Sequence, residues 1–261
     1  MIKSRIHLSI VIPAYNEEKR ISKTLDTIVE WRSNNDEFEI ELIVSDDGSI
    51  DNTREIIKNY MNIYSWIRLV KNKHIGMMNA IISGVNQAKH SFIGTLEADG
   101  SCHPREFNKF VRFLDDYDFI VGSRYMGRVQ GKSFFRRILS KGMSTMFNLL
   151  FAFKLLDPQV SFRMYKKVVI KSVLPKLRLN HDGLKCSEIA VKAYGLGYDI
   201  VEVPIEYSHN SDSRAVPSGL KGLYVVAGAT LALVYLWIQT HHEYQAGMFK
   251  RNPLRLGFPL A

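Results

Sequence analysis

The sequence predicts an α/β fold built on a mainly parallel sheet, and three observations support that prediction. Short apolar, β-rich runs alternate with segments of helical periodicity through the first half of the chain, as expected for consecutive βαβ units. The length of 261 residues suits one α/β domain with an appendage. Hydrophobic residues make up 46% of the chain, an ordinary share for a globular protein with a substantial core.

The first expected strand covers residues 8–12 and is closed by Pro13, and a helical pattern follows over residues 17–31. A second apolar run at 40–44 leads through a turn into a helix at 51–62. The later elements continue the alternation, with strands at 67–70, 92–96 and 119–121 and helices at 76–88 and 104–114. In such sheets ligands collect at the carboxyl ends of the strands. Polar residues that directly follow a strand are therefore the candidates for function.

The net charge favours negatively charged binding partners but does not distinguish among their classes. The net charge is +9 with a pI near 9.4, which favours polyanions such as nucleic acid, anionic lipid or phosphorylated substrates. Cys102 and Cys186 lie far apart without metal-ligand spacing, so the sequence predicts neither a disulfide framework nor a zinc site. A reducing compartment follows as the expected environment.

Acidic and polar residues follow three of the expected strands, at residues 13–18, 45–49 and 97–100. One such cluster is well explained as a helix cap, and this is the preferred interpretation for residues 51–53. Three clusters at three strand ends indicate a ligand site, because carboxylates brought together repel unless a cation or hydrogen-bond donors lie among them.

Glu97 and Asp99 are spaced i, i+2 at a strand end, where a bend lets both side chains face one ligand. Two carboxylates beside a diphosphate suit Mg²⁺ or Mn²⁺, which would neutralise charge on a departing nucleoside diphosphate; the alternative is an acidic surface turn. Asp47 is a candidate hydrogen-bond acceptor for a base or ribose. Tyr15 is placed to pack against the base, and Pro13 to fix the loop.

Two arginines are candidates for binding phosphate. Arg124 follows the strand at 119–121, where a guanidinium can hold phosphate through two hydrogen bonds. Arg214 lies in a polar, turn-rich stretch at 210–219, which is either a lid that reaches the diphosphate or a linker before the last helix.

These motifs, in this order, resemble family-two glycosyltransferases of the GT-A fold, most closely the dolichol-phosphate mannose and glucose synthases. The matching segments are Ile-Val-Ile-Pro-Ala-Tyr-Asn-Glu at 10–17, Leu-Ile-Val-Ser-Asp-Asp-Gly-Ser at 42–49, Glu-Ala-Asp at 97–99, Gly-Ser-Arg-Tyr at 122–125, Asp-Pro at 157–158 with Ser-Phe-Arg at 161–163, and residues 198–205. Together they cover residues 7–221. The resemblance implies an inverting glycosyltransferase with a nucleotide-sugar donor such as GDP-mannose or UDP-glucose.

The resemblance also assigns roles. It implies a catalytic set of Asp99, Arg124 and Arg214 and a metal set of Glu97, Asp99 and Ser101. The implied nucleotide-sugar site comprises Pro13, Tyr15, Glu17, Ser45, Asp47, Glu97, Ala98, Asp99, Ser101, Arg124, Arg214 and Lys221. Three departures stand out: the family's first acid is Asp rather than Glu97, Ser101 replaces a longer polar ligand, and Lys221 lies one place late.

The acceptor decides whether a general base is needed. A polyprenyl or dolichyl phosphate is already an anion at neutral pH, so catalysis would depend on positioning and on stabilising the leaving diphosphate. A sugar hydroxyl acceptor in polysaccharide or glycolipid synthesis would need a carboxylate base, for which Asp182 and Glu188 are the candidates. Arg137 and Arg163 are the candidates for the acceptor phosphate.

Two segments predict contact with membrane lipid. Residues 132–153, within a catalytic domain expected at 1–218, read as a basic amphipathic helix for an anionic membrane surface, or else as a helix packed on the sheet. An apolar helix is expected at 219–243, before a basic tail at 244–261. It either spans a bilayer or docks on the domain or forms a homo-oligomer. Nucleotide sugars in the cytosol would place the catalytic domain on the cytoplasmic face.

Three rival functions remain. A nucleotidyltransferase shares the α/β sheet, whereas a dinucleotide enzyme is disfavoured because Gly-x-Gly-x-x-Gly is missing after the first strand. A nucleic-acid-binding module fits the charge, but the basic residues are dispersed and no recognition motif stands out; no nucleic acid partner is expected. A non-catalytic nucleotide-sugar-binding partner subunit is the third, given the departure at Glu97.

Overall fold

The computed structural model describes residues 5–127, 129–130, 134–179, 182–208 and 220–255. Its centre is a seven-stranded sheet in the order β3-β2-β1-β4-β7-β5-β8. The strands are β1 (Ile6–Ala14), β2 (Phe38–Asp46), β3 (Ile67–Lys71), β4 (Phe92–Thr95), β5 (Phe119–Ser123), β7 (Arg163–Lys166) and β8 (Ile200–Pro204). All neighbouring strands pair in parallel except at β7, which is antiparallel to β4 and β5. The mainly parallel sheet expected from the sequence is confirmed.

The apolar runs form strands because helices cover both faces of the sheet. In β1 the side chain of Leu8 lies with Phe107 near Gly94 on one face, whereas Val11 packs against Gly84 on the other. Leu8 and Val11 are both fully buried. A central parallel strand is therefore apolar on both faces, which explains an uninterrupted hydrophobic run rather than an alternating one.

The helices form two groups around the sheet. The α3 helix (Met77–Gln87) packs on β1 and β2 and contacts α5 (Lys167–Val173) and α6 (Asp182–Gly195). On the other side, α1 (Ile21–Ser33) contacts α2 (Thr53–Ile63) and the helical segment η1 (Pro104–Phe113). The helix expected at 104–114 is a 3₁₀ helix, with Pro104 at its start. The remaining short elements are η2 (Leu174–Lys176) and the parallel pair β6 (Val129–Gln130) and β9 (Tyr207–Ser208).

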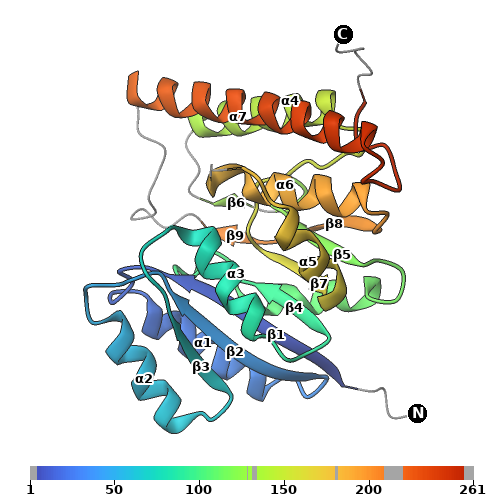
Figure 1. Cartoon of the computed structure of the whole chain (residues 1–261). Helices are drawn as coiled ribbons and strands as arrows, with labels where there is room; N and C mark the ends of the chain where they lie inside the picture. Colours follow the sequence, from blue (N-terminus) through green and yellow to red (C-terminus); the bar gives the residue numbers. More distant parts are fainter. Residues whose placement is uncertain (1–4, 128, 131–133, 180–181, 209–219, 256–261) are drawn as a thin grey trace.

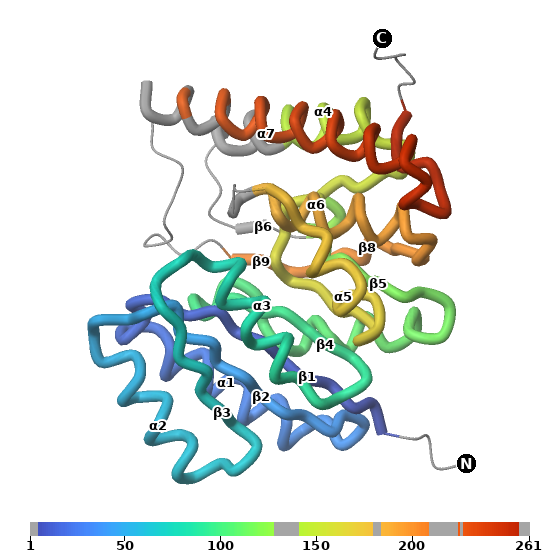
Figure 2. Tube along the Cα trace, in the orientation of Figure 1, coloured from blue at the N-terminus to red at the C-terminus, as the bar shows by residue number. Residues whose placement is uncertain are grey.

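Two long helices lie beyond α6, at the end of the molecule away from β3 (Figure 1). They are α4 (Phe134–Leu150) and α7 (Leu220–Gln245); α7 contacts both α4 and α6. The chain trace in Figure 2 shows that the first third of the sequence builds the β1–β3 part of the sheet, whereas α4 from the middle of the chain and α7 from near its end lie together at the other end.

The C-terminal helix expected at 219–243 is present as α7, and one of its sides is buried. Leu233, Leu236 and Thr240 are buried against the domain, while Leu231 and Tyr235 are exposed. In the part of the chain that the structure describes, no helix combines the length and apolarity needed to cross a membrane.

Candidate functional site

The polar clusters after β1 and β2 lie side by side at one edge of the sheet. Pro13 is in register with Ser45, and the N–H of Asp47 donates to the carbonyl of Ala14 at 2.7 Å. The Asn16 N–H donates to the Ser49 hydroxyl, and the Asn16 amide oxygen accepts from the N–H of residue 50. Asn16 adopts a left-handed φ of 52° to make this turn. The carboxyl ends of parallel strands thus bring the clusters together, as the sequence predicted.

The third cluster is joined to the same edge from β4. The N–H of Leu96 donates to the carbonyl of Val11 at 3.1 Å, and the Thr24 hydroxyl of α1 donates to the carbonyl of Ala98 at 2.7 Å. Ala98 is buried. The backbone of this acidic segment is therefore held between β1 and α1, which leaves little freedom in where its side chains lie.

Tyr15 and Asp47, both expected to hold the nucleoside, meet at His74, a residue to which the sequence analysis gave no role. The rings of Tyr15 and His74 stack with their centroids 4.0 Å apart and an interplanar angle of 13°. His74 Nδ1 lies 2.9 Å from a carboxylate oxygen of Asp47. The only signal in the sequence was a histidine just after the third strand.

Three further residues of the expected nucleotide-sugar site have identifiable local partners. The Glu17 carboxylate forms an ion pair with Arg20 at 2.6 Å, and the buried Ser45 hydroxyl accepts from the Asn72 amide at 3.0 Å. Pro13, the second-last residue of β1, is paired with Ser45 of β2. These contacts fix the loop geometry at the edge of the sheet, whatever ligand the edge receives.

Glu97 is bound through both of its carboxylate oxygens. Oε1 accepts from the Ser161 hydroxyl at 2.5 Å, and Oε2 accepts from the Tyr207 hydroxyl at 2.7 Å. Burial, together with the nearby charge of Asp99, raises the pKa of Glu97 above its ordinary value. Tyr207 and Ser161 are far from Glu97 in sequence and were not assigned to the site beforehand.

Asp99 and Ser101 fit a divalent metal better than Glu97 does. An Asp99 carboxylate oxygen accepts from the Ser101 N–H at 2.9 Å. The Ser101 hydroxyl is buried and makes no hydrogen bond of normal geometry to a described residue. No group of three His, Cys, Asp or Glu side chains suited to a metal occurs among the described residues. Mg²⁺ and Mn²⁺ are often held by one or two carboxylates plus substrate phosphates, which fits Asp99 and Ser101.

Arg124 lies at the end of β5 as predicted, and a neighbouring acid holds its guanidinium. Asp157 accepts from Nε at 2.7 Å and from Nη2 at 2.8 Å, and the guanidinium lies 5.2 Å from the Tyr207 ring. Burial alone would lower the pKa of Arg124, but the Asp157 carboxylate raises it instead. Asp157 is fixed in turn by its backbone N–H, which donates to Glu202 at 2.6 Å.

The structure corrects the expectation for Arg163. Its side chain is fully buried, and its three guanidinium nitrogens donate to the carbonyls of Val160, Cys186 and Pro158, each at 2.7 Å. A side chain used in this way holds the 158–163 loop and does not reach a lipid phosphate. The Ser-Phe-Arg segment therefore carries a structural arginine.

The structure also corrects the expectation that Glu188 is a candidate base. It is fully buried in α6, and its two oxygens accept from the N–H groups of Arg178 and Leu179 at 2.6 and 3.0 Å. Burial raises its pKa. In this position it anchors the loop before α6 and has no access to an acceptor hydroxyl. The side chains of Asp182, Arg137 and Lys221, and the whole of Arg214, lie outside the described residues.

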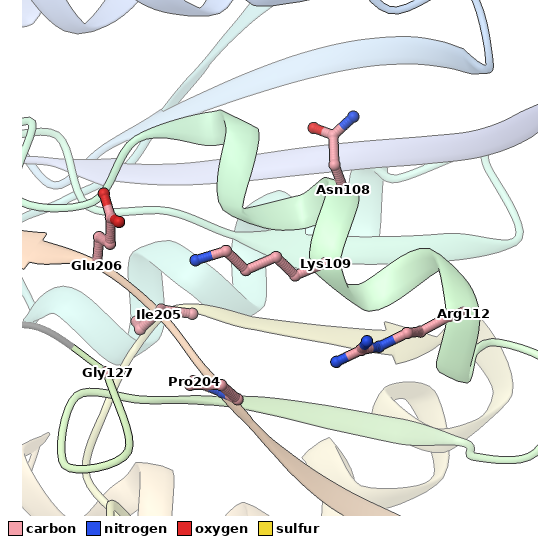
Figure 3. A pocket seen from close by; sticks show the side chains of 7 residues that line it. All are labelled: Asn108, Lys109, Arg112, Gly127, Pro204, Ile205 and Glu206. Atoms are coloured by element: carbon pink, nitrogen blue, oxygen red, sulfur yellow. The ribbon is translucent and has the colours of Figure 1, made fainter.

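A groove of about 480 Å³ lies beside this site, between η1 and the chain after β8. Lys109 and Arg112 extend into it from η1, facing Pro204, Ile205 and Glu206 (Figure 3). None of the residues predicted for the site lines this groove. Its lining includes Glu206, the sequence neighbour of Tyr207.

Comparison with known proteins identifies the family. The model of "Glycosyl transferase family 2" matches residues 9–174. A dolichyl-phosphate beta-glucosyltransferase of Trichomonas vaginalis is 29% identical over 228 residues, covering 82% of this chain and 70% of the relative.

Solved structures share the fold at low sequence identity. Glucosyl-3-phosphoglycerate synthase from Mycobacterium tuberculosis, crystallised with Mn²⁺, UDP and phosphoglyceric acid, matches with a TM-score of 0.61 at 17% identity, over 89% of this chain and 78% of that one. A mannosyltransferase from Pyrobaculum calidifontis, in complex with GDP-Man and Mn²⁺, matches with a TM-score of 0.59 at 18% identity, over 96% and 67%. The GT-A type of fold expected from the motifs is confirmed.

Proposed function

This chain belongs to glycosyl transferase family 2 and is a glycosyltransferase, and we propose that it moves a hexose from a nucleoside-diphosphate sugar to a dolichyl or polyprenyl phosphate with inversion. The observation that carries the proposal is the convergence of three strand ends. They bring Tyr15, Asp47 and Asp99 to one edge of the sheet. The similarity to a dolichyl-phosphate beta-glucosyltransferase supports the proposed acceptor.

The donor would lie across this edge. The Tyr15–His74 ring pair lies where a base would bind, and Asp99 with Ser101 would hold Mg²⁺ or Mn²⁺ against the diphosphate. When bound, the metal neutralises the charge that develops on the leaving nucleoside diphosphate. Arg124, held in place by Asp157, adds a fixed positive charge nearby.

Glu188, one of the two candidate bases for a sugar hydroxyl acceptor, does not fit that role, and the side chain of the other, Asp182, lies outside the described residues. A hydroxyl nucleophile needs a carboxylate that is free to take its proton. Glu188 is buried with both oxygens occupied by backbone N–H groups. A phosphate oxygen is already an anion at neutral pH and needs no such base, so positioning and leaving-group stabilisation are enough.

The end of the molecule formed by α4 and α7 is our proposed contact with membrane lipid. The α4 and α7 helices lie side by side at this end (Figure 1). The exposed side chains include Tyr224, Leu231 and Tyr235 of α7 and Lys141 and Leu149 of α4. Exposed aromatic and apolar side chains with a cation nearby suit the interface of an anionic membrane. A lipid acceptor would be met there, and a cytosolic donor would place the catalytic domain on the cytoplasmic face.

The test is transfer of labelled sugar into lipid. The full-length protein is given radiolabelled UDP-glucose or GDP-mannose, dolichyl phosphate vesicles and Mn²⁺, and the label is extracted into organic solvent. We expect lipid-linked label with one donor, at least a hundredfold less with Asp99→Asn, and full activity in Asp116→Asn, which changes an exposed acid outside the site.

Three results would count against the proposal. Nucleotide binding without any lipid-linked label from either donor would remove dolichyl phosphate as the acceptor for those donors. Equal activity of Asp99→Asn and Asp116→Asn would remove the metal and diphosphate role of Asp99. Nucleotide binding with no transfer to any acceptor would favour the non-catalytic partner subunit.

A further inference from the structure

His74 lies at the edge of the sheet, where the nucleoside of a donor would bind, and more than half of its side chain is exposed. Its side-chain exposure is 55%, whereas that of Asp47 beside it is 4%. One face of the imidazole is covered by Tyr15 at a centroid distance of 4.0 Å. His74 thus presents the accessible polar edge of this pair, while Asp47 lies behind it.

The oxygens of Asp47 are already used by the loop that carries His74. Oδ1 accepts from the N–H groups of Ile75 at 3.1 Å and Gly76 at 3.2 Å, and Oδ2 accepts from Gly76 at 3.0 Å and from His74 at 2.9 Å. Gly76 adopts a φ of 122°, a conformation that favours glycine, and this turns its N–H toward the carboxylate. Asp47 therefore holds the loop of residues 74–76, and His74 is the residue of this pair that is exposed to a base.

The contacts of His74 define which of its nitrogens carries hydrogen. Nδ1 lies 2.9 Å from the Asp47 carboxylate and 3.0 Å from the Asp47 carbonyl, and both of these oxygens are acceptors. Nδ1 must therefore be the donor, which leaves a lone pair on Nε2 of the neutral ring. The Nε2 atom makes no hydrogen bond to a described residue and is available as an acceptor.

We propose that His74 determines base specificity by accepting, through Nε2, a hydrogen bond from a ring N–H of the donor's base. Uracil offers such an N–H at N3 and guanine at N1, whereas cytosine N3 and adenine N1 carry lone pairs that repel Nε2. The inference rests on the proposed function, because it needs a nucleoside diphosphate at this edge. A site built around one acceptor rejects bases that cannot donate to it.

The test measures binding and not turnover. UDP, CDP, GDP and ADP are titrated by calorimetry into the full-length protein with Mn²⁺. The variants are His74→Phe, which keeps an aromatic ring on Tyr15 but has no acceptor, and His74→Gln, which restores an amide oxygen. His90→Phe is the matched control, because His90 precedes β4 at the opposite end of the sheet.

We expect wild type and His90→Phe to prefer UDP over CDP, or GDP over ADP, by at least about fivefold. His74→Phe should lose about two- to tenfold in affinity for the preferred nucleotide, the range for one net hydrogen bond, and should no longer discriminate. His74→Gln should recover part of the preference. Unfolding curves of each variant establish that the chain is folded.

Each remaining outcome overturns a defined statement. If His74→Phe is folded and keeps the wild-type preference, His74 does not read the base, and the proposed function is untouched. If His74→Phe and His90→Phe weaken the preference equally, the effect is not specific to this edge, and the inference fails. If wild type binds none of the four nucleotides, the donor site of the proposed function and this inference fail together.

Discussion

The ion pair between Lys192 of α6 and Glu243 of α7 offers a direct test of how α7 is attached to the domain. Lys192 is completely buried and Glu243 is 15% exposed. The ring of Phe249 lies 5.6 Å from the ammonium group, and the buried Glu188 carboxylate of α6 interacts with it electrostatically. Replacing Glu243 with Gln removes the one acid that forms an ion pair with Lys192 among the described residues and leaves the buried ammonium without that direct partner.

The expected cost follows from the burial of the lysine. Breaking a buried pair by removing one partner destabilises proteins by about 3–5 kcal/mol, because the remaining charge stays out of water. An exposed pair contributes about 0–1 kcal/mol. Lys58 and Glu55 form such a pair on α2, with exposures of 48% and 64%. The same Glu→Gln change at position 55 is therefore a matched control.

The assay is urea unfolding of the purified full-length chain, followed by circular dichroism and by tryptophan fluorescence. We expect Glu243→Gln to lower the free energy of unfolding by about 3 kcal/mol or more and Glu55→Gln by less than about 1 kcal/mol. A double variant, Lys192→Met with Glu243→Leu, should recover most of the loss because it removes both charges of the pair. A Glu243→Gln variant within about 0.5 kcal/mol of wild type would refute the buried pair and with it this attachment of α7.

Three further results are expected. Tyr207→Phe removes the hydroxyl that donates to Glu97 and should lower the free energy of unfolding in urea by about 1–3 kcal/mol. The control is Tyr60→Phe, because the Tyr60 hydroxyl donates to Asp26 at the surface. An equal or smaller loss in Tyr207→Phe than in this control would contradict the prediction. Burial raises the pKa of Glu97 above 4.5, so the folded state holds this proton more tightly than the unfolded state. Wild type should therefore lose stability relative to Glu97→Gln as the pH rises above about 4.5. Parallel curves of stability against pH for the two proteins would show that the pKa of Glu97 is not raised. Chelation of metal should abolish transfer, and Ser101→Ala should raise the Mn²⁺ concentration for half-maximal nucleotide binding several-fold; an unchanged Mn²⁺ requirement would remove Ser101 from the metal site.

The architecture was readable from the sequence because it depends on local periodicity. The run at residues 8–12 shows no alternation of apolar and polar residues, and it became the fully buried centre of strand β1, with helices on both faces. Repetition of that pattern with intervening helices predicts a parallel sheet, and a parallel sheet brings its strand ends to one edge. The convergence of Tyr15, Asp47 and Asp99 followed from that geometry alone.

The same local reading did not reveal β7 or the burial of Arg163. The β7 strand reads Arg-Met-Tyr-Lys, begins with a charged residue and runs antiparallel between β4 and β5. Arg163 is tolerated inside because the 158–163 loop and α6 supply three carbonyl acceptors. In the sequence, an arginine whose hydrogen bonds are satisfied by backbone carbonyls cannot be distinguished from one that binds a phosphate.

What the sequence determined by itself was the order of the layers and the edge at which ligands gather, since side-chain periodicity is a property of neighbouring residues. What only the tertiary structure decided was which side chains remain available at that edge. Glu97 is bound by Tyr207, which is 110 positions away, and Asp47 is occupied by the loop of His74. Hydrogen-bond partners of this kind are chosen when distant segments meet in the folded chain, and a local pattern carries no record of that choice.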